Sequence, residues 1–517
     1  MMAAETISAQ RLRTLLHDRV NVPVEADRHL AGLTLDSRRV EAGFAFVALP
    51  STRRHGTRGH GLDFLDDALE RGAAAVLVDA ADPRADAAAR SAAMRRGVPM
   101  LAVPDLARAL GAIAARFHSE PSSALARVYA VTGTDGKTSV THFLAAMRDR
   151  PDHPAAMLGT LGQGRIGATV AAGLTTPDAI SVQAALADLV GRGCREVALE
   201  ASSHGLDQHR LEGTRIDVAV LTQLGRDHLD YHTDIDDYAA AKARLFDWPG
   251  LAGVALNLDD AFGRELMARV RPQIRRIGYG RGEIADAPDG TLRALDVAPR
   301  ADGIDFRLRW RGRDHAVALP LLGLFNVDNV LAAAAALLAG GERFIDVVVA
   351  LNAIRPVPGR MERFGPASGP GIVVDYAHNA GALTAALAAV RAHTPGRVWC
   401  VFGAGGDRDP GKRPLMAAAA AAGADHVVVT DDNPRSEDPA AIVADIVAGM
   451  PADTGYQVEH DRGKALSLAW QQARPGDAIL LAGKGHETTQ TRAGEVLFWS
   501  DREAAAALAG PAAGGAP

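Results

Sequence analysis

The sequence predicts an α/β protein whose domains are built on parallel β-sheets, and two observations support this. Short apolar runs typical of buried strands alternate with alanine-rich helical stretches along most of the chain. Nearly every run also ends in a polar or glycine-rich turn, as in AAAVLVDA, RVYAVTG, EVALEASS, DVAVLTQL, GIVVDYAH, VWCVFGAGG, HVVVTDD and AILLAGKG. Because ligands bind at the carboxyl ends of strands in such sheets, we expect the functional side chains in these turns.

The length indicates several domains. A chain of 517 residues exceeds what one hydrophobic core usually organises, so two or three domains are expected. Proline-bearing breaks at residues 118–127 and 352–360 separate sheet-like blocks. They predict three domains, at residues 1–121, 122–354 and 355–517.

One segment of the middle domain departs from the parallel pattern. Within residues 291–322, the stretch GIDFRLRWRG alternates apolar and charged side chains, with Ile304, Phe306, Leu308 and Trp310 on one face. This period of two is typical of a half-exposed antiparallel strand, so a small β-meander is expected here.

Composition and charge exclude several classes of function. The chain is 48% hydrophobic and 23% charged, with a net charge of −6, so it has no basic field for nucleic acid. Two distant cysteines, Cys194 and Cys400, fit a reducing compartment. The charged N-terminus has no apolar signal segment, and the apolar runs are too short to span a membrane. We expect a cytoplasmic, monomeric protein without membrane insertion.

The most informative stretch is AVTGTDGKTSVTHF, residues 130–143, which resembles a phosphate-binding loop between a strand and a helix. Backbone amides at the helix start can hold phosphate oxygens. Lys137 can reach the β- and γ-phosphates, and the Thr138 hydroxyl suits Mg²⁺. Asp135 would repel phosphate unless its side chain turns away, for example toward loop amides. The alternative, a glycine turn capping a structural helix, leaves the lysine and threonine unexplained.

Polar residues that suit a metal follow two other strands. Glu200 ends the strand EVALE, and DHLDYH offers Asp227, His228, Asp230 and His232. Taken alone, DHLDYH is compatible with a dinuclear metal hydrolase or with a solvated turn. A hydrolase would leave the phosphate-binding loop without a role.

Taken together and in order, these motifs resemble the Mur ligases of peptidoglycan synthesis, over nearly the whole chain. The resemblance rests on LTLDSRRVEAGFAFVALP, GTDGKTS, TTPDA, EASSHGLDQHR, TQLGRDHLDYH, YAAAKARLF, GLFNVDN, PGRMERF, VDYAHNAGAL, VFGAGGDRDPGKRPLM, DDNPRSEDP and GKGHE. The chain departs from the family at Asp135, where asparagine is usual.

The resemblance implies three α/β domains: an N-terminal uridine-nucleotide-binding domain, a central P-loop ATPase-like sheet carrying the meander, and a C-terminal Rossmann-like domain. It also implies an ADP-forming, ATP- and Mg²⁺-dependent ligase. In this family a substrate carboxylate attacks the γ-phosphate of ATP, and an amine then displaces phosphate from the resulting acyl phosphate.

The family's functional residues transfer to the matching positions. Thr138, Glu200, His228 and a carbamylated Lys242 are implied to bind the metal, and Lys137, Lys242 and His228 to act in catalysis. Without the resemblance, Lys242 would be taken for a surface lysine. The implied ATP-binding residues are Gly133, Thr134, Asp135, Gly136, Lys137, Thr138, Ser139, Asn326, Arg360 and Asp375. Those implied for the sugar nucleotide and its peptide are Ser37, Thr175, Thr176, Ser202, Gln208 and Arg210, together with the 51–61 loop.

The segment DDNPRSEDP predicts which amino acid is added. Diaminopimelate differs from lysine by a distal carboxylate, which Arg435 can bind with two parallel hydrogen bonds. Asp432 and Asn433 supply polar partners, and the resemblance adds Arg408, Gly483 and Glu487. The family's diaminopimelate-adding members carry this DNPR, although asparagine–proline turns are also common in ordinary loops.

We therefore expect meso-2,6-diaminopimelate to be joined to UDP-N-acetylmuramoyl-L-alanyl-D-glutamate during cytoplasmic synthesis of the peptidoglycan precursor. The alternatives are a lysine-adding or another Mur ligase, a folylpolyglutamate synthase, and, from a different class, a P-loop kinase or ATPase. The N-terminal DSR segment disfavours the folate enzyme.

Overall fold

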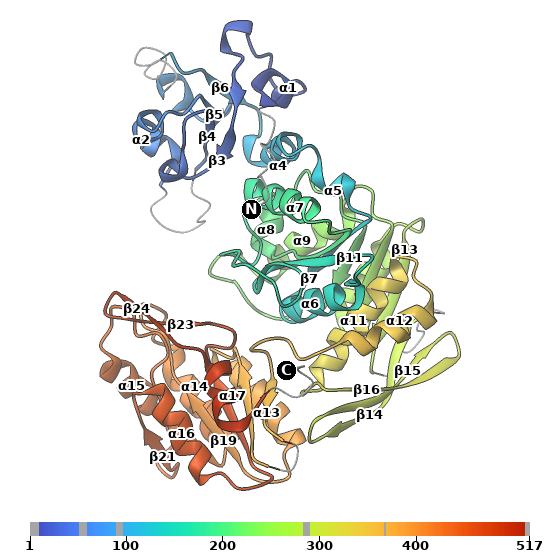
Figure 1. Ribbon diagram of the computed structural model, residues 1–517, viewed down its shortest axis with the longest axis vertical. Helices are drawn as coiled ribbons and strands as arrows, with labels where there is room; N and C mark the ends of the chain where they lie inside the picture. The colour runs from blue at the N-terminus through green and yellow to red at the C-terminus, as the bar shows by residue number, and fades with distance from the viewer. Residues whose placement is uncertain (1–9, 51–58, 89–96, 283–289, 367–368, 512–517) are drawn as a thin grey trace. The chain divides into compact units, whose positions relative to one another are not determined.

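The computed structural model describes residues 10–50, 59–88, 97–282, 290–366 and 369–511. The chain forms two compact units (Figure 1). The first comprises Met1–Gly278 and Ala335–Glu342, and the second comprises Tyr279–Ala334 and Arg343–Pro517. The division falls inside strand β13 (Arg275–Gly280) and inside helix α11 (Phe325–Ala339).

The first unit begins with a small parallel sheet of strand order β3-β4-β5-β6. Its strands are β3 (Gly32–Thr34), β4 (Phe44–Ala48), β5 (Ala75–Asp79) and β6 (Met100–Val103). Helices α1 (Leu12–Leu16) and α4 (Leu106–Phe117) share one core with the sheet, and α2 (Leu65–Glu70) belongs to another. A short pair, β1 (Gln10–Arg11) and β2 (His29–Leu30), precedes it.

A second sheet in this unit carries the phosphate-binding loop. Strands β7 to β12 of this ten-stranded sheet follow the order β12-β11-β7-β10-β8-β9, and β7 lies parallel between β10 and β11. The strands are β7 (Arg127–Thr132), β8 (Ala155–Gly159), β9 (Gly162–Gly164), β10 (Glu196–Glu200), β11 (Val218–Leu221) and β12 (Gly253–Asn257). The accompanying helices are α5 (Pro121–Ala124), α6 (Lys137–Arg148), α7 (Ala179–Gly191), α8 (Ser203–Asp207), α9 (Ile235–Ala243) and α10 (Ala261–Arg269).

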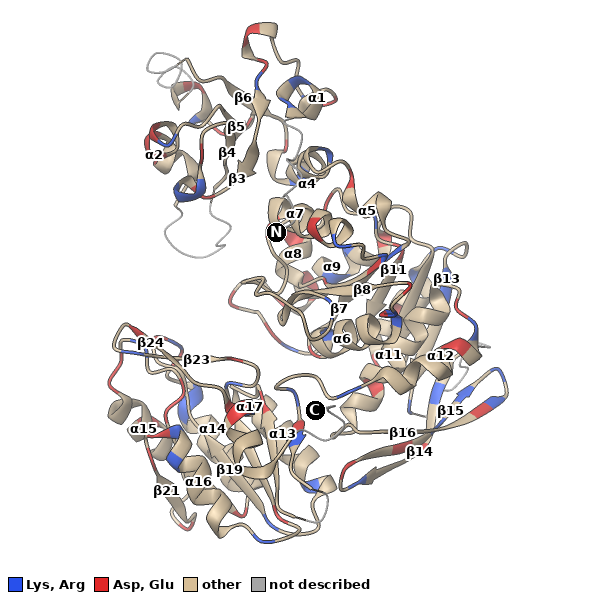
Figure 2. Ribbon diagram, viewed as in Figure 1, with Lys and Arg blue, Asp and Glu red and all other residues tan. Residues whose placement is uncertain are grey.

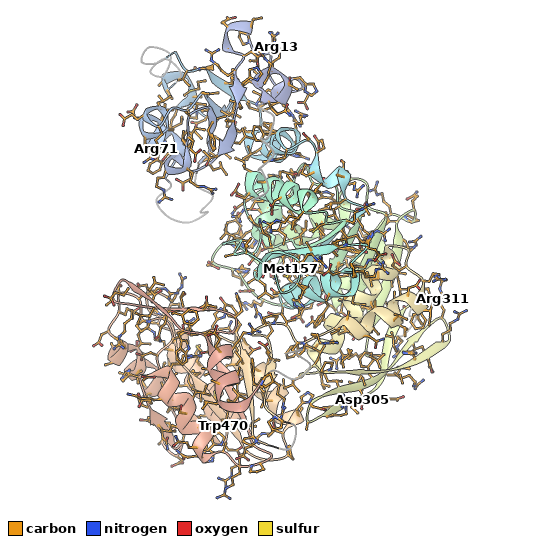
Figure 3. The ribbon with its side chains drawn as sticks, viewed as in Figure 1. Arg13, Arg71, Met157, Asp305, Arg311 and Trp470 are labelled. Atoms are coloured by element: carbon orange, nitrogen blue, oxygen red, sulfur yellow. The ribbon has the colours of Figure 1, made fainter. Side chains whose placement is uncertain are left out.

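The predicted β-meander is confirmed in the second unit. Strands β14 (Leu292–Arg300), β15 (Gly303–Trp310) and β16 (Arg313–Leu319) pair antiparallel, and Figure 3 labels Asp305 and Arg311 on it. On β15 the expected alternation holds, because Ile304, Phe306 and Leu308 are buried while Asp305 and Arg307 between them are not. Helix α12 (Phe344–Ala350) follows α11 in the chain.

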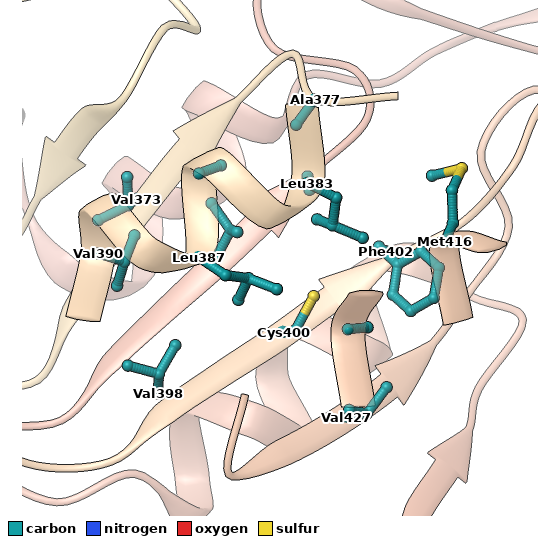
Figure 4. Close-up of a cluster of buried hydrophobic side chains, with 14 of the residues drawn as sticks. Val373, Ala377, Leu383, Leu387, Val390, Val398, Cys400, Phe402, Met416 and Val427 are labelled. Atoms are coloured by element: carbon teal, nitrogen blue, oxygen red, sulfur yellow. The ribbon is translucent and has the colours of Figure 1, made fainter. Parts of the chain in front are cut away.

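The C-terminal sheet is doubly wound, with the strand order β17-β18-β22-β19-β20-β21. Helices α13 (Ala380–His393), α14 (Lys412–Gly423) and α15 (Pro439–Val447) bury apolar side chains in one core, part of which is shown in Figure 4. Helices α16 (Arg462–Gln472) and α17 (Asp501–Ala509) contribute to the core on the other face. The strands are β17 (Glu362–Phe364), β18 (Gly371–Asp375), β19 (Val398–Phe402), β20 (His426–Val429), β21 (Tyr456–Val458) and β22 (Ala478–Ala482), and a hairpin follows, β23 (Thr489–Arg492) and β24 (Glu495–Phe498).

The α/β fold predicted from the sequence is therefore confirmed, since the quoted apolar runs coincide with strands in the three sheets. Basic and acidic residues are interspersed along the ribbon of both units in Figure 2. Within the described part of the chain, every helix is too short or too polar to cross a membrane.

Candidate active site

The phosphate-binding loop joins β7 to α6 at the carboxyl end of its sheet. A side chain on Gly133 would lie 1.7 Å from the Thr222 hydroxyl, so only glycine allows this close approach. Gly136 adopts a positive φ of 81° and starts the twelve-residue helix α6 at Lys137. The loop therefore presents amides at a helix N-terminus, which is the arrangement that binds phosphate.

Asp135 points away from the loop amides, which differs from the expectation that it would bond them. Its Oδ2 accepts a hydrogen bond from Gln223 Nε2 at 3.0 Å, and the residue is exposed. Its backbone carbonyl accepts a bond from the Thr222 hydroxyl at 2.6 Å. The segment after β11 thus keeps this carboxylate in solvent, where its charge is screened.

Two lysines meet at the same loop. Lys137 Nζ donates to the carbonyl oxygens of Gly133 and Thr134, at 2.9 and 2.7 Å. Lys242 Nζ, from α9, donates to the same Gly133 oxygen at 2.7 Å and lies 4.3 Å from the centre of the Tyr238 ring. Lys242 is only 1% exposed, so the surface-lysine interpretation is wrong. Burial, and then the charge of Lys137, lower the pKa of Lys242 well below its usual value.

Thr138 and Glu200 are brought together from α6 and β10. The Thr138 hydroxyl donates to Glu200 Oε2 at 3.1 Å, and both side chains are buried. Thr160, which sequence reasoning missed, donates its backbone N–H to Oε1 at 2.7 Å, and its hydroxyl lies 3.2 Å from Oε2. A side chain on Gly159 would clash with Oε1 at 2.2 Å. These oxygens form a hard donor set that suits Mg²⁺.

The histidines of DHLDYH lie in an aromatic cluster. His228 has a positive φ of 55°, and its ring centre is 4.8 Å from that of His204. The His204 ring is also tilted against the Tyr231 ring, with their centres 4.1 Å apart. Burial, followed by the charges of His228 and His232, lowers the pKa of His204 to about 4. Burial likewise lowers the pKa of His228.

The metal-hydrolase alternative lacks structural support. His232 is fully buried 3.5 Å from Asp237, whereas Asp227 is exposed. Among the residues that the structure describes, no three His, Cys, Asp or Glu side chains form a metal-binding group.

The residues expected to bind the substrate peptide form one network near Glu200. The Thr176 hydroxyl donates to the Glu200 carbonyl at 2.8 Å, and Arg210 Nη1 donates to the Thr176 carbonyl at 2.7 Å. Gln208 Oε1 accepts from Arg210 Nε at 3.0 Å. Ser202 caps α8 through the Gly205 N–H, and Thr175 lies 3.1 Å from the Thr160 hydroxyl. Thr176 therefore organises the turn, while the other side chains border it.

In the first sheet, Ser37 is buried directly after the Asp36 that caps the short helix Ser37–Arg39. A hydrogen bond from Ser37 is the main cause that lowers the pKa of Asp67. Of the expected 51–61 loop, residues 51–58 lie outside the described residues.

In the second unit, Arg360 and Asp375 lie together. The Arg360 guanidinium is 4.6 Å from the centre of the Tyr376 ring. Asp375 accepts the N–H groups of Met361 and Ala377 at 2.8 and 2.9 Å; desolvation raises its pKa, and Arg360 opposes this. Asn326, on α11, is buried and donates to the Leu322 carbonyl at 2.8 Å.

The residues expected to bind diaminopimelate converge at the carboxyl ends of β19, β20 and β22. Arg435 has a φ of 55°, and its Nη1 donates to the Gly406 carbonyl at 2.6 Å. A side chain on Gly405 would meet both Arg435 Nη1, at 2.9 Å, and Arg408 Cγ, at 3.8 Å. One on Gly483 would lie 2.6 Å from Asp432 Oδ2. Two arginines and a carboxylate therefore line one glycine-walled region.

Asn433 and Glu487 complete this region. Asn433 Nδ2 donates to Glu487 Oε2 at 3.0 Å, and Asn433 Oδ1 accepts the Thr491 N–H at 3.0 Å. The backbone of Arg435 pairs with the hairpin, its N–H donating to the Thr491 carbonyl at 2.9 Å. Sequence reasoning missed Lys484, which lies beneath both side chains and is fully buried.

A sheet that carries a P-loop, followed in the chain by a doubly wound sheet with polar side chains at its strand ends, is an architecture that suits an ATP-dependent ligase, and family comparisons agree. Residues 29–118 match the model "Mur ligase family, catalytic domain", residues 131–337 match "Mur ligase middle domain", and residues 359–485 match "Mur ligase, glutamate ligase domain". The chain belongs to the Mur ligase family, which confirms the resemblance found in the sequence.

Individual relatives are more specific. A protein of Alkalilimnicola ehrlichii named UDP-N-acetylmuramoyl-L-alanyl-D-glutamate–2,6-diaminopimelate ligase is 51% identical over 495 residues, covering 96% of this chain and 97% of its own length. A protein of the same name from Xanthomonas oryzae pv. oryzae is 45% identical over 479 residues, 92% of each chain. A solved structure with this name is 34% identical, with a TM-score of 0.69 over 97% of this chain and 98% of its own.

Proposed function

We propose that this Mur ligase joins meso-2,6-diaminopimelate to UDP-N-acetylmuramoyl-L-alanyl-D-glutamate with consumption of ATP. The observation that carries the proposal is the region at Arg435, where a guanidinium, two carboxylates and an amide gather on glycine-walled loops. This set matches the distal carboxylate and distal ammonium of diaminopimelate. Relatives of this name at 45–51% identity support the same assignment.

The chemistry has two steps that balance without a redox partner. A carboxylate oxygen of the nucleotide substrate attacks the γ-phosphorus, the bond to the β-phosphate oxygen breaks, and ADP leaves. The neutral amine of diaminopimelate then attacks the acyl carbon, and the tetrahedral intermediate expels phosphate and loses the amine proton. Positioning and charge neutralisation supply most of the catalysis in such reactions.

The residues of the loop fit the first step. Amides at the start of α6 would bind phosphate oxygens, and Lys137 would leave its carbonyl partners to contact the γ-phosphate. Thr138 and Glu200 would hold Mg²⁺, with His228 as a further ligand; the ion supplies charge neutralisation on the phosphates. Arg360, Asp375 and Asn326 are proposed to contact the nucleotide, Arg360 through its planar fork.

Lys242 fits the role of a carbamate. An amine attacks CO₂ to give a carbamate and a proton, and burial beside Lys137 favours the neutral amine that this requires. The product is an anion beside Lys137, so it converts a repulsive lysine pair into an attractive one. The residues proposed to hold the sugar nucleotide and its peptide are Ser37, Thr175, Thr176, Ser202, Gln208 and Arg210.

The decisive experiment offers meso-diaminopimelate and L-lysine in parallel with ATP, Mg²⁺ and UDP-N-acetylmuramoyl-L-alanyl-D-glutamate, and reads the product mass. Product formed only with diaminopimelate supports the proposal. Product formed only with lysine keeps the family and overturns the role of Arg435, while ATP hydrolysis without an amide product indicates an ATPase.

A variant pair tests Arg435 itself. Arg435→Lys keeps the charge but loses the two parallel bonds, so KM for diaminopimelate should rise by about 10- to 100-fold. Arg492→Lys, at the exposed position whose backbone pairs with Arg435, is the matched control and should leave KM unchanged.

A further inference from the structure

Lys484 is a fully buried lysine on the loop between β22 and β23, and nothing in the proposed reaction yet uses it. It is 0% exposed, so it cannot touch a bound substrate directly. Burying an ammonium is costly unless it is paired and hydrogen-bonded. Its contacts therefore indicate what the charge is for.

Among the described residues, both side-chain hydrogen bonds of Lys484 are to residues of the diaminopimelate region. Its Nζ donates to Glu487 Oε2 at 3.0 Å and to Asn433 Oδ1 at 3.2 Å. Asn433 Nδ2 in turn donates to the same Glu487 oxygen at 3.0 Å. The three side chains form a closed triangle under the loop.

The triangle fixes the orientation of two side chains. Asn433 Oδ1 accepts from Lys484 and from the Thr491 N–H, so the amide can take only one of its two flipped orientations. Within the described part of the chain, both side-chain donors to Glu487 bond its Oε2 atom. The Oε1 atom can therefore accept a hydrogen bond from a ligand. Glu487 has a side chain that is 32% exposed, so that oxygen can be reached.

The neighbouring buried cation does not compete for this role. Arg462 is 2% exposed and makes a two-point ion pair with Asp501, at 2.7 and 2.6 Å, so its charge is already neutralised. Lys484 is consequently the cation that contacts Glu487 at hydrogen-bond distance.

We propose that Lys484 is a positioning residue that holds Glu487 and Asn433 in the one arrangement that accepts the distal ammonium of diaminopimelate. The inference rests on the proposed function of this region. The proposal predicts that a change at Lys484 alters the binding of diaminopimelate only. ATP should be unaffected, because the phosphate-binding loop is a different segment, in the first unit.

The test is the variant Lys484→Met, which keeps the apolar stem and removes the ammonium. KM for diaminopimelate should rise by about 10- to 100-fold, the worth of hydrogen bonds to charged groups, while KM for ATP and for the nucleotide substrate stays unchanged. Lys464→Met is the matched control, because Lys464 lies on α16 in the same unit with a side chain 73% exposed. It should leave all three KM values unchanged.

A double-mutant cycle with Glu487→Gln separates positioning from an independent effect. If Lys484 acts through Glu487, the double variant has a KM for diaminopimelate close to that of the worse single variant. Fold-changes that multiply would overturn the proposal.

The melting temperature of the variants distinguishes a positioning role of Lys484 from a role in folding. Removing one partner of a buried ion pair costs stability, so Lys484→Met should melt below the wild type; it should still fold, because the Glu487 side chain is 32% exposed and can be solvated. Equal rises in all three KM values, or loss of folding in both Lys484→Met and Lys484→Gln, would assign Lys484 to the scaffold and overturn the proposal. A wild type that does not use diaminopimelate would instead overturn the proposed function.

Discussion

Lys137 Nζ and Lys242 Nζ donate to one and the same atom, the carbonyl oxygen of Gly133, at 2.9 and 2.7 Å. Two ammonium groups on one acceptor would repel each other, and this repulsion, together with burial, favours the neutral amine at Lys242. The pair is therefore prepared for anions: phosphate for Lys137, and conversion to a carbamate for Lys242.

Replacing Lys242 with methionine should lower kcat by about 100-fold or more, since a charge that stabilises the phosphate transfer would be lost. The protein should fold, because a buried amine that favours its neutral form is replaced by an apolar chain of similar length. Carbon-13 NMR after exposure to labelled bicarbonate should show a carbamate signal in the wild type that the variant lacks. Full activity in the variant would contradict the assignment.

Glu200→Gln should raise the Mg²⁺ concentration for half-maximal activity by about 10-fold or more. A natural control lies on the same strand: Glu196, at the other end of β10, pairs with Arg148 at 2.6 Å and is also buried. Glu196→Gln should reduce stability, because it leaves a buried arginine incompletely paired, without changing the Mg²⁺ requirement. A shift of the same size in both variants would argue against Glu200 as a ligand. Activity is measured over a range of Mg²⁺ concentrations.

Asp135→Asn should lower KM for ATP, because it removes a negative charge beside the phosphates while keeping an acceptor for Gln223. The side chain is exposed, so the gain should be modest, about 2- to 5-fold, and smaller at high salt. Initial rates at low and high ionic strength give the comparison. If KM for ATP is unchanged at both ionic strengths, Gln223 holds the Asp135 carboxylate too far from the phosphates to repel them.

His142 should make folding sensitive to acid. It is buried within α6, and burial lowers its pKa to about 4. Above the ordinary histidine pKa of about 6.5, both folded and unfolded chains carry it neutral; below that, only the unfolded chain takes up the proton until the folded pKa is reached. Stability contributed by the neutral ring is therefore full above about pH 6.5 and lost progressively toward pH 4.

Urea unfolding at about pH 7.5 and pH 5 tests this, because His142→Leu should reduce the difference in unfolding free energy by up to about 2 kcal/mol. His17→Leu, at an exposed histidine, is the control and should leave the difference unchanged. If His142→Leu also leaves the difference unchanged, other groups cause the acid sensitivity.

Much of this structure could be predicted from local patterns. The strands could be predicted because each is a short apolar run followed by a turn. Strand β15 could be predicted because its charged and apolar residues alternate. The phosphate-binding loop at Lys137 could be predicted because such a loop requires a strand, glycines, a lysine and a helix in that order.

The remaining features of the site could not be predicted, because they depend on contacts between segments that are distant in the sequence. Nothing near Lys242 in the sequence indicates that it is buried, since that follows from α9 packing beside Gly133, 109 residues away. Thr160 contacts Glu200 across 40 positions, and Lys484 contacts Asn433 across 51. Such contacts arise only once the sheets bring their strand ends together. The three-domain boundaries stay a prediction.

The ion pair between Arg462 and Asp501 bears on how the chain is made. Arg462 is buried at the start of α16, but its carboxylate partner is supplied by α17, 39 residues later. Until that helix has been synthesised, a guanidinium in this core would have no counter-ion, at a cost that opposes burial. During translation, the C-terminal sheet is therefore expected to close late, so that a prematurely terminated chain would be left with an open, degradable end.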